Sequence, residues 1–142
     1  MRFTPIVNPR RNLDAWGDGI FGAKRGARLH KGRDYQYAVG EEFLSPVDGT
    51  VTKIGLPYAN DIYRYVEILS SNREVIFRCF YINPSVQKGD KVISGQRIGF
   101  VQNLQLRYNE HMTNHVHVEC IVDPAFFFDN VAPQRQRGST WV

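Results

Sequence analysis

Short runs of β-branched and aromatic residues alternate with turn-forming residues through the middle of the chain. Within several runs, apolar and polar residues alternate one by one, which is typical of a strand with one buried face. No window of a dozen residues has an apolar period near 3.6, the period of an amphipathic helix. The runs that predict strands are FLSPVDGTVTKIG, YRYVEILSS, REVIFRCFYI, DKVISGQRIGFVQ and HVHVECIV. Turn formers between them, such as Lys88-Gly89-Asp90 and Ser94-Gly95, predict hairpins, so an all-β, β-rich domain with little helix is expected.

The two ends of the chain differ in composition from its middle. Residues 1–24 are rich in Gly, Asn and Arg and predict a loop-like N-terminal arm laid over the sheet. Its expected anchors are Leu13, Trp16, Ile20 and Phe21. Residues 125–142 are expected to form a C-terminal extension that packs on the core through its three consecutive phenylalanines. The folded domain itself is therefore expected to span residues 25–124.

Composition and charge narrow the class of protein. At 142 residues, with 42% hydrophobic and 23% charged residues, the chain predicts one globular domain, and a monomer is expected. No apolar run approaches the roughly 20 residues of a membrane-spanning helix, so no membrane insertion is expected. The net charge of +4 favours anionic partners, but the cations are spread out and no nucleic-acid motif accompanies them. The start, MRFTPIVNPRRN, lacks the apolar core of an export signal, so no signal peptide is expected.

Two of the four histidines occur in one alternating run, TNHVHVEC, over residues 113–120. Side chains of a strand point to opposite faces in turn, so His115, His117 and Glu119 share one face and valines occupy the other. The run therefore predicts one apolar face and one face able to do chemistry. An amphipathic strand whose histidines simply face water fits the same pattern. Two roles are open for Glu119: its carboxylate accepts a hydrogen bond from one imidazole, or it forms a surface ion pair.

Another histidine lies near a carboxylate in the run LHKGRD, where His30 and Asp34 are four residues apart. In an extended strand their side chains would be about 13 Å apart, at roughly 3.3 Å per residue, too far to share a metal ion. A turn at Gly32 would bring them together, since glycine adopts positive φ at little cost. A polar loop without a metal is the alternative. With His117, the two residues supply the N, O, N ligand set of a catalytic zinc site that keeps an open position.

The two motifs and the residues between them resemble the lysostaphin/LytM-type zinc metallopeptidases, which cut peptide cross-links of bacterial peptidoglycan. The motifs are His-x-Gly-x-Asp at residues 30–34 and His-x-His at residues 115–117. The runs DYQYAVGEEFLSPVDGTVTKIG and VQKGDKVISGQRIGFV agree with the family's turn positions, so the resemblance spans roughly residues 26–122. It implies a compact antiparallel β-sandwich-like metallopeptidase domain with a groove.

The resemblance also implies a role for each motif residue. His30, Asp34 and His117 would bind Zn²⁺, and His115 would be the general base. The substrates would be peptidoglycan peptides, with the basic residues holding anionic cell-wall polymers. An enzyme without an export signal that acts on the wall would be made in the cytoplasm and released at lysis or carried in a phage particle, which favours a phage origin.

One position departs from the family pattern. Where the family usually has a second catalytic histidine, the run CFYI places Tyr81. Tyrosine donates a hydrogen bond to an oxyanion as histidine does, and losing one such donor costs about 10²–10³-fold in rate. Tyr81 is therefore expected to be a catalytic residue of a zinc endopeptidase. The same tyrosine occurs in the leukocyte cell-derived chemotaxins, which keeps open the alternative of a zinc-stabilised binding or signalling module with weak or no peptidase activity.

The sequence also leads to expectations for two cysteines and one loop histidine. Cys79 and Cys120 are expected to be free thiols, because alternation places Cys120 opposite His117 and Cys79 on the face of Tyr81. His111, in the loop before the second motif, is expected to be exposed, with a swing into the groove as the alternative. Neither His111 nor Glu119 is expected to be a primary site residue.

Overall fold

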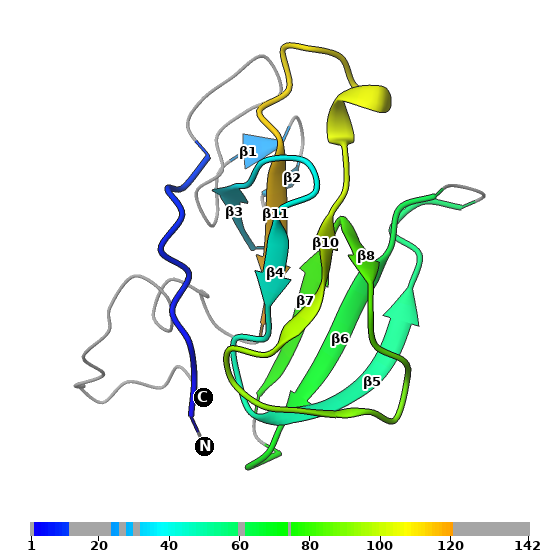
Figure 1. Ribbon diagram of the computed structural model, residues 1–142. Helices are drawn as coiled ribbons and strands as arrows, with labels where there is room; N and C mark the ends of the chain where they lie inside the picture. The colour runs from blue at the N-terminus through cyan, green and yellow to red at the C-terminus, as the bar shows by residue number, and fades with distance from the viewer. Residues whose placement is uncertain are drawn as a thin grey trace.

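The computed structural model describes residues 2–11, 24–25, 28–29, 32–59, 62–73 and 75–120, whose regular structure is almost entirely antiparallel β (Figure 1). In chain order the elements are β1 (Lys24–Arg25), β2 (Arg28–Leu29), β3 (Arg33–Gln36), β4 (Glu42–Leu44), β5 (Gly49–Gly55), β6 (Tyr65–Ser70), β7 (Ile76–Phe80), β8 (Ile82–Pro84), β9 (Lys91–Val92), β10 (Arg97–Val101), one 3₁₀ turn (Leu104–Leu106) and β11 (His115–Glu119). The predicted all-β class with little helix is confirmed. Within the described residues, no helix is long and apolar enough to cross a membrane.

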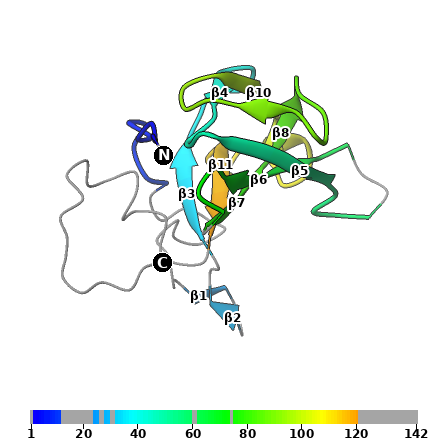
Figure 2. The same ribbon diagram turned by 90° about the horizontal axis from the view of Figure 1, so that it is seen from below.

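The strands form two stacked sheets and a separate hairpin. The larger sheet has the order β3-β11-β7-β6-β5-β9 and the smaller one β4-β10-β8, while β1 pairs with β2. Seen from below, β4, β10 and β8 lie over one face of the larger sheet (Figure 2). The apolar side chains between the two layers form one core, to which the larger sheet contributes Val66, Phe77 and Val116 and the smaller sheet Phe43 and Ile98. This arrangement confirms the antiparallel β-sandwich-like class.

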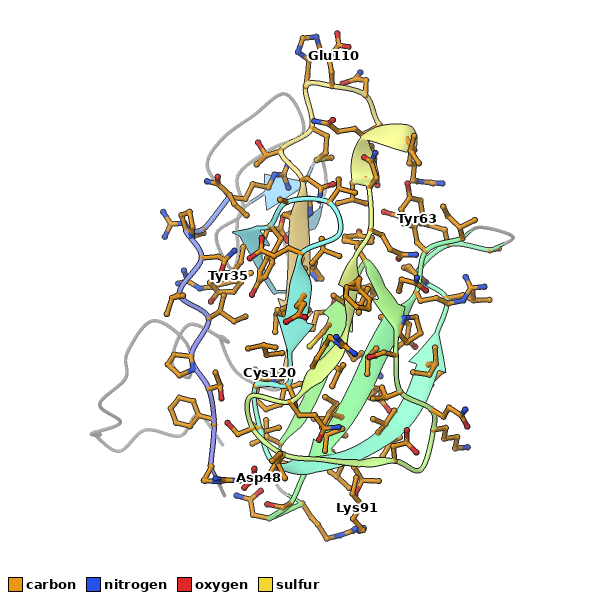
Figure 3. All side chains as sticks on the ribbon, in the orientation of Figure 1. Tyr35, Asp48, Tyr63, Lys91, Glu110 and Cys120 are labelled. Atoms are coloured by element: carbon orange, nitrogen blue, oxygen red, sulfur yellow. The ribbon has the colours of Figure 1, made fainter. Side chains whose placement is uncertain are left out.

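Alternation along the strands explains which face of the large sheet is buried. In β11, Val116 and Val118 are fully buried in the core, so His115 and His117, which alternate with them, point to the opposite face. Each predicted strand run contains a strand, and the predicted turns occur, with positive φ at Gly89 and Gly95. β3 was not predicted as a strand, because its sequence is mostly polar and its apolar contacts come from a single buried tyrosine, Tyr35 (Figure 3).

Tyr81 breaks the alternation between the two sheets. It has φ of 77°, an uncommon value for a residue other than glycine, and it lies where the chain leaves β7 for β8 in the smaller sheet. As a result, consecutive rings point toward the histidines: Phe80 meets His117 edge-on at a centroid distance of 5.1 Å, and Tyr81 meets His115 at 5.6 Å.

The same break makes the parity argument for the cysteines wrong. Cys79 lies in the core rather than on the face of Tyr81, because the positive φ at Tyr81 resets the alternation after Phe80. Cys120 packs against that same core. Both thiols are nevertheless free, as predicted.

Residues 2–11 run along the larger sheet at its β3 edge (Figure 1). The backbone N–H of Arg11 donates to the carbonyl of Asp34 at 2.8 Å, and that of Gln36 donates to Pro9 at 2.7 Å. These bonds pair backbone groups of β3 that an edge strand would otherwise leave open. The anchors expected in residues 12–23 and the C-terminal extension lie outside the described residues.

Candidate functional site

Pairing between β3 and β11 brings the two motifs together. His117 lies opposite Asp34 in the register, and its Nδ1 is 2.8 Å from Asp34 Oδ1. His115 Nε2 is 3.4 Å from the other oxygen of the same carboxylate, Oδ2. A Cβ on Gly32 would lie 2.2 Å from the carbonyl oxygen of Val118, so this position needs glycine for the close approach of the two strands. The prediction that His115 and His117 share one face of the strand is confirmed, and the side chain of Asp34 lies on that face as well.

His117 is held between two carboxylates. Its Nε2 is 2.9 Å from Glu119 Oε2, on the same strand two residues further on. Burial alone would lower the pKa of His117, but the hydrogen bonds with Asp34 and Glu119 outweigh it and raise the pKa to about 9. A histidine that ligates a metal through one ring nitrogen commonly donates the other N–H to a carboxylate, which is the arrangement of His117 with Glu119.

Asp34 Oδ1 and His117 Nδ1, 2.8 Å apart, are a carboxylate oxygen and an imidazole nitrogen, two ligand types that zinc binds in proteins. Asp34 is almost fully buried, with 1% of its surface exposed. The third predicted ligand, His30, lies outside the described residues, and within those residues no group of three ligating side chains is placed to hold a metal ion. The described part of the site thus contains two of the three predicted ligands, and they lie next to each other.

His115 is a neutral imidazole with a defined tautomer. Its Nδ1 is 2.7 Å from the backbone carbonyl of Thr113, which can only accept, so Nδ1 carries the hydrogen and Nε2 carries the lone pair. Burial lowers the pKa of His115 to about 4, although the charge of Asp34 opposes the shift. At neutral pH the basic nitrogen therefore points to the side of the Asp34 carboxylate.

Tyr81 belongs to a cluster of tyrosines beside His115. Its hydroxyl is 3.0 Å from that of Tyr58, which is in turn hydrogen-bonded to the hydroxyl of Tyr108. The ring of Tyr63 meets Tyr81 edge-on and its hydroxyl donates to the carbonyl of Asn103 at 2.7 Å. Burial raises the pKa of Tyr81 well above its usual value and that of Tyr58 to about 12. Both hydroxyls are therefore protonated at neutral pH and able to donate.

Arg11 is a site residue that sequence reasoning missed. Its Nη1 is 2.7 Å from Asp34 Oδ2, and the two side chains are only 3% and 2% exposed. The arm around it has no periodic pattern, and an ion pair between residues far apart leaves no signal in a single sequence. Phe80 was missed for a different reason, because alternation assigns it to the face opposite Tyr81. His111 is exposed in the loop whose tip carries Glu110 (Figure 3), as predicted.

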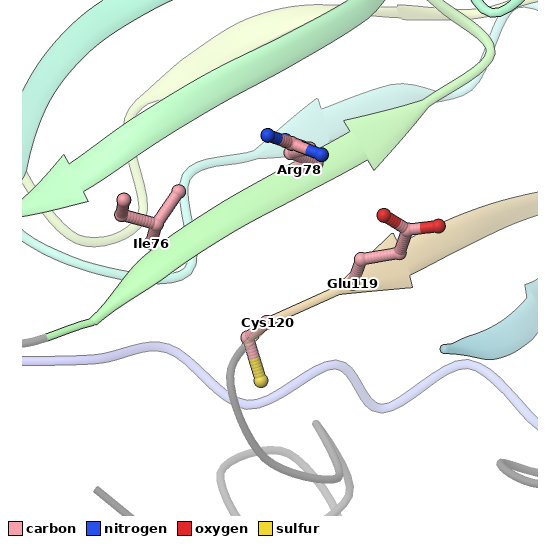
Figure 4. Close-up of a pocket in the computed structure, with 4 residues that line it drawn as sticks. All are labelled: Ile76, Arg78, Glu119 and Cys120. Carbon is pink, nitrogen blue, oxygen red and sulfur yellow. The ribbon is translucent and has the colours of Figure 1, made fainter. Parts of the chain in front are cut away.

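A pocket of about 230 Å³ opens between β7 and β11 next to this centre (Figure 4). Its described lining consists of Ile76, Arg78, Glu119 and Cys120. Neither histidine nor Asp34 lines it, so the pocket lies beside the centre rather than over it. Glu119 is shared between the two.

The opposite pKa shifts of the two histidines predict how the stability of the metal-free protein depends on pH. An ordinary histidine has a pKa near 6.5. Below pH 6.5 the unfolded chain binds the His115 proton more readily, so stability falls as the pH falls toward 4. Above pH 6.5 the folded chain holds the His117 proton more tightly, so its contribution is lost as the pH rises toward 9.

We therefore expect the melting temperature in the presence of a chelator to be highest near pH 6.5 and lower at both pH 5 and pH 9. Thermal unfolding followed by circular dichroism across this range measures it. His117→Gln serves as the control, since it should remove the alkaline decline and keep the acidic one. A wild-type melting temperature that stays level or increases from pH 6.5 to 9 would contradict the assignment for His117.

The fold and the described site define a small antiparallel β-sandwich with a buried His–Asp centre of the kind that binds metal ions. The model of peptidase family M23 matches residues 28–125. This chain belongs to peptidase family M23, and the predicted family is confirmed.

Individual proteins agree with this assignment. Leukocyte cell-derived chemotaxin-2 of Mus musculus is 32% identical over 112 residues, which cover 79% of this chain and 73% of that protein. The catalytic domain of the antimicrobial peptidase lysostaphin from Staphylococcus simulans has a similar structure, with a TM-score of 0.63 and 17% identity over 82% of this chain and 92% of that one. A zinc-containing peptidase from Vibrio cholerae gives a TM-score of 0.58 and 22% identity over 84% of this chain and 36% of that one. At these identities the two structures support the fold.

Proposed function

We propose that this protein is a zinc-dependent endopeptidase that hydrolyses stem or cross-link peptides of bacterial peptidoglycan. The observation that carries the proposal is the buried pair of Asp34 Oδ1 and His117 Nδ1, 2.8 Å apart, with a neutral histidine beside it. Asp34, His117 and, from the sequence motif, His30 would hold the zinc. When bound, zinc supplies a Lewis acid that polarises the scissile carbonyl and acidifies a water.

The remaining groups would carry the proton and the developing charge. His115 presents a neutral Nε2 that can take a proton from the attacking water and return it to the leaving amine. Tyr81, protonated and held by Tyr58, can donate a hydrogen bond to the oxyanion that forms at the carbonyl. Glu119 keeps the His117 ring in orientation through Nε2.

The family and the charge of the chain support the proposed substrate class. Lysostaphin, which shares the fold, is an antimicrobial peptidase, and a net charge of +4 favours the acidic polymers of a bacterial wall. The proposal includes action at the wall after release at lysis or from a phage particle.

A second candidate function is a zinc-stabilised binding module. The observation that favours it is the 32% identity to leukocyte cell-derived chemotaxin-2, whose name describes a signalling protein. In such a module the same residues would hold the metal for stability, and Tyr81 would be a packing residue.

Digestion of purified cell walls of several chemotypes separates the two functions. We expect the zinc-loaded protein to release new amino termini from at least one wall, and we expect a chelator to stop the release. Asp34→Ala is the matched negative control, because it removes one ligand and should abolish both zinc binding and release. No release from any wall by a protein with confirmed bound zinc would overturn the endopeptidase in favour of the binding module.

A further inference from the structure

We propose that Arg11, in the N-terminal arm, is a positioning residue for the metal site, because it binds one oxygen of Asp34 and leaves the other to the metal. The inference rests on the proposed function, in which Asp34 and His117 are zinc ligands. It adds a part of the chain, residues 2–11, that lies outside the segment matched by the family model.

The contacts around Asp34 divide its two oxygens. Oδ2 is 2.7 Å from Arg11 Nη1 and 3.4 Å from His115 Nε2. Oδ1 is 2.8 Å from Nδ1 of His117, the other proposed ligand. Since the guanidinium binds the oxygen that faces away from His117, Asp34 is oriented as a ligand through Oδ1 alone. Without Arg11 the carboxylate would lose the bond that fixes Oδ2, and its orientation would depend on its contacts with the two histidines.

Arg11 reaches Asp34 from a fixed backbone. The N–H of Arg11 donates to the carbonyl of Asp34 itself, and Arg10 pairs with Tyr35 in a β-bridge. The side-chain amide of Gln36 donates to the carbonyl of Arg10 at 3.0 Å. The arm is therefore bonded to β3 at Asp34 and again two residues further on at Gln36, so the guanidinium has little freedom to move. A group that orients a ligand needs this rigidity.

Charge alone would favour a different outcome. A buried guanidinium repels a divalent cation, so its removal would make the Asp34 carboxylate more attractive to one. If Arg11 orients Asp34, its removal should instead weaken zinc binding, because groups that orient metal ligands typically contribute about 10–100-fold to metal affinity. Arg11 and His117 bind different oxygens of Asp34, which favours the orienting role. The two roles predict opposite changes in zinc affinity when Arg11 is replaced, so the direction of the measured change decides between them.

The test is the equilibrium zinc affinity of Arg11→Met, measured by competition with a chromophoric chelator at fixed pH. Methionine keeps the length and packing of the side chain and removes the charge and the donors. We expect the dissociation constant for zinc to rise by about 10–100-fold. Arg10→Met is the matched control, because Arg10 is exposed and its bonds to β3 use backbone atoms, so its dissociation constant should stay within twofold of wild type.

Three outcomes would overturn the inference. An unchanged or lower zinc dissociation constant in folded Arg11→Met would show that the ion pair does not orient Asp34, while the zinc site itself would stand. No zinc binding by the wild-type chain would overturn the proposed function as well. If Arg11→Met does not fold, Arg11→Lys replaces it in the test, because lysine keeps the buried charge without the planar donor group. This variant should still bind zinc more weakly than wild type. Wild-type zinc affinity in Arg11→Lys is the third outcome that would overturn the inference.

Discussion

His115→Ala is expected to reduce wall-peptide hydrolysis by about 10²–10⁴-fold while leaving the zinc content unchanged, because the proposed mechanism makes His115 the general base and not a ligand. The reason lies in the hydrogen bond from Nδ1 to the carbonyl of Thr113, which fixes the tautomer and turns the lone pair of Nε2 toward the Asp34 carboxylate. Burial lowers the pKa of His115 to about 4, so the imidazole is in its basic form at neutral pH. Turnover is measured by the release of amino termini, and zinc by atomic absorption on the same preparation.

Two further variants serve as controls for this experiment. His111→Ala changes an exposed loop histidine and should hydrolyse walls at the wild-type rate. Asp34→Ala should lose both zinc and hydrolysis, so it shows the pattern of a lost ligand. If His115→Ala also loses zinc, His115 is a ligand rather than a base. If it keeps both zinc and full turnover, another group takes the proton from water.

The residues that sequence could predict are those governed by strand alternation. The run from His115 to Glu119 has a period of two, and period two places its histidines on one face whatever the rest of the fold does. The same reasoning predicts the buried valines between them and most of the strands of the large sheet. The family motif adds Asp34, whose pairing with His117 across β3 and β11 is observed.

The residues that sequence could not predict depend on contacts between distant segments or on one unusual backbone angle. Arg11 meets Asp34 only because the arm pairs with the edge of β3, and nothing in its neighbourhood is periodic. The positive φ at Tyr81 turns its ring toward the histidines together with that of its neighbour Phe80, against the alternation of a regular strand, and a positive φ in a tyrosine is too uncommon to assume from sequence. The contacts between the hydroxyls of Tyr58, Tyr81 and Tyr108 join three separate loops and strand ends, which alternation cannot relate.

The tyrosine cluster supplies the last prediction, which concerns the oxyanion. If the hydroxyl of Tyr81 donates to the developing charge, Tyr81→Phe should lower kcat by about 10²-fold with unchanged zinc binding, the usual cost of one such donor. Tyr58→Phe should have a smaller effect, about fivefold, because its hydroxyl positions that of Tyr81 and does not itself donate to the oxyanion; the substitution also removes the bond to Tyr108. In both variants kcat should change more than KM, since the hydrogen bond forms in the transition state.

Tyr63→Phe is the matched control for both variants. It removes a hydroxyl from the same aromatic cluster, but that hydroxyl donates to the carbonyl of Asn103 rather than to Tyr81, so kcat should stay within about twofold of wild type. Full activity in Tyr81→Phe would assign the oxyanion bond to another donor and leave Tyr81 as a packing residue against His115. An equal loss in Tyr63→Phe and Tyr81→Phe would mean that the cluster acts through its packing, because the two substitutions remove the same atom from different hydrogen bonds.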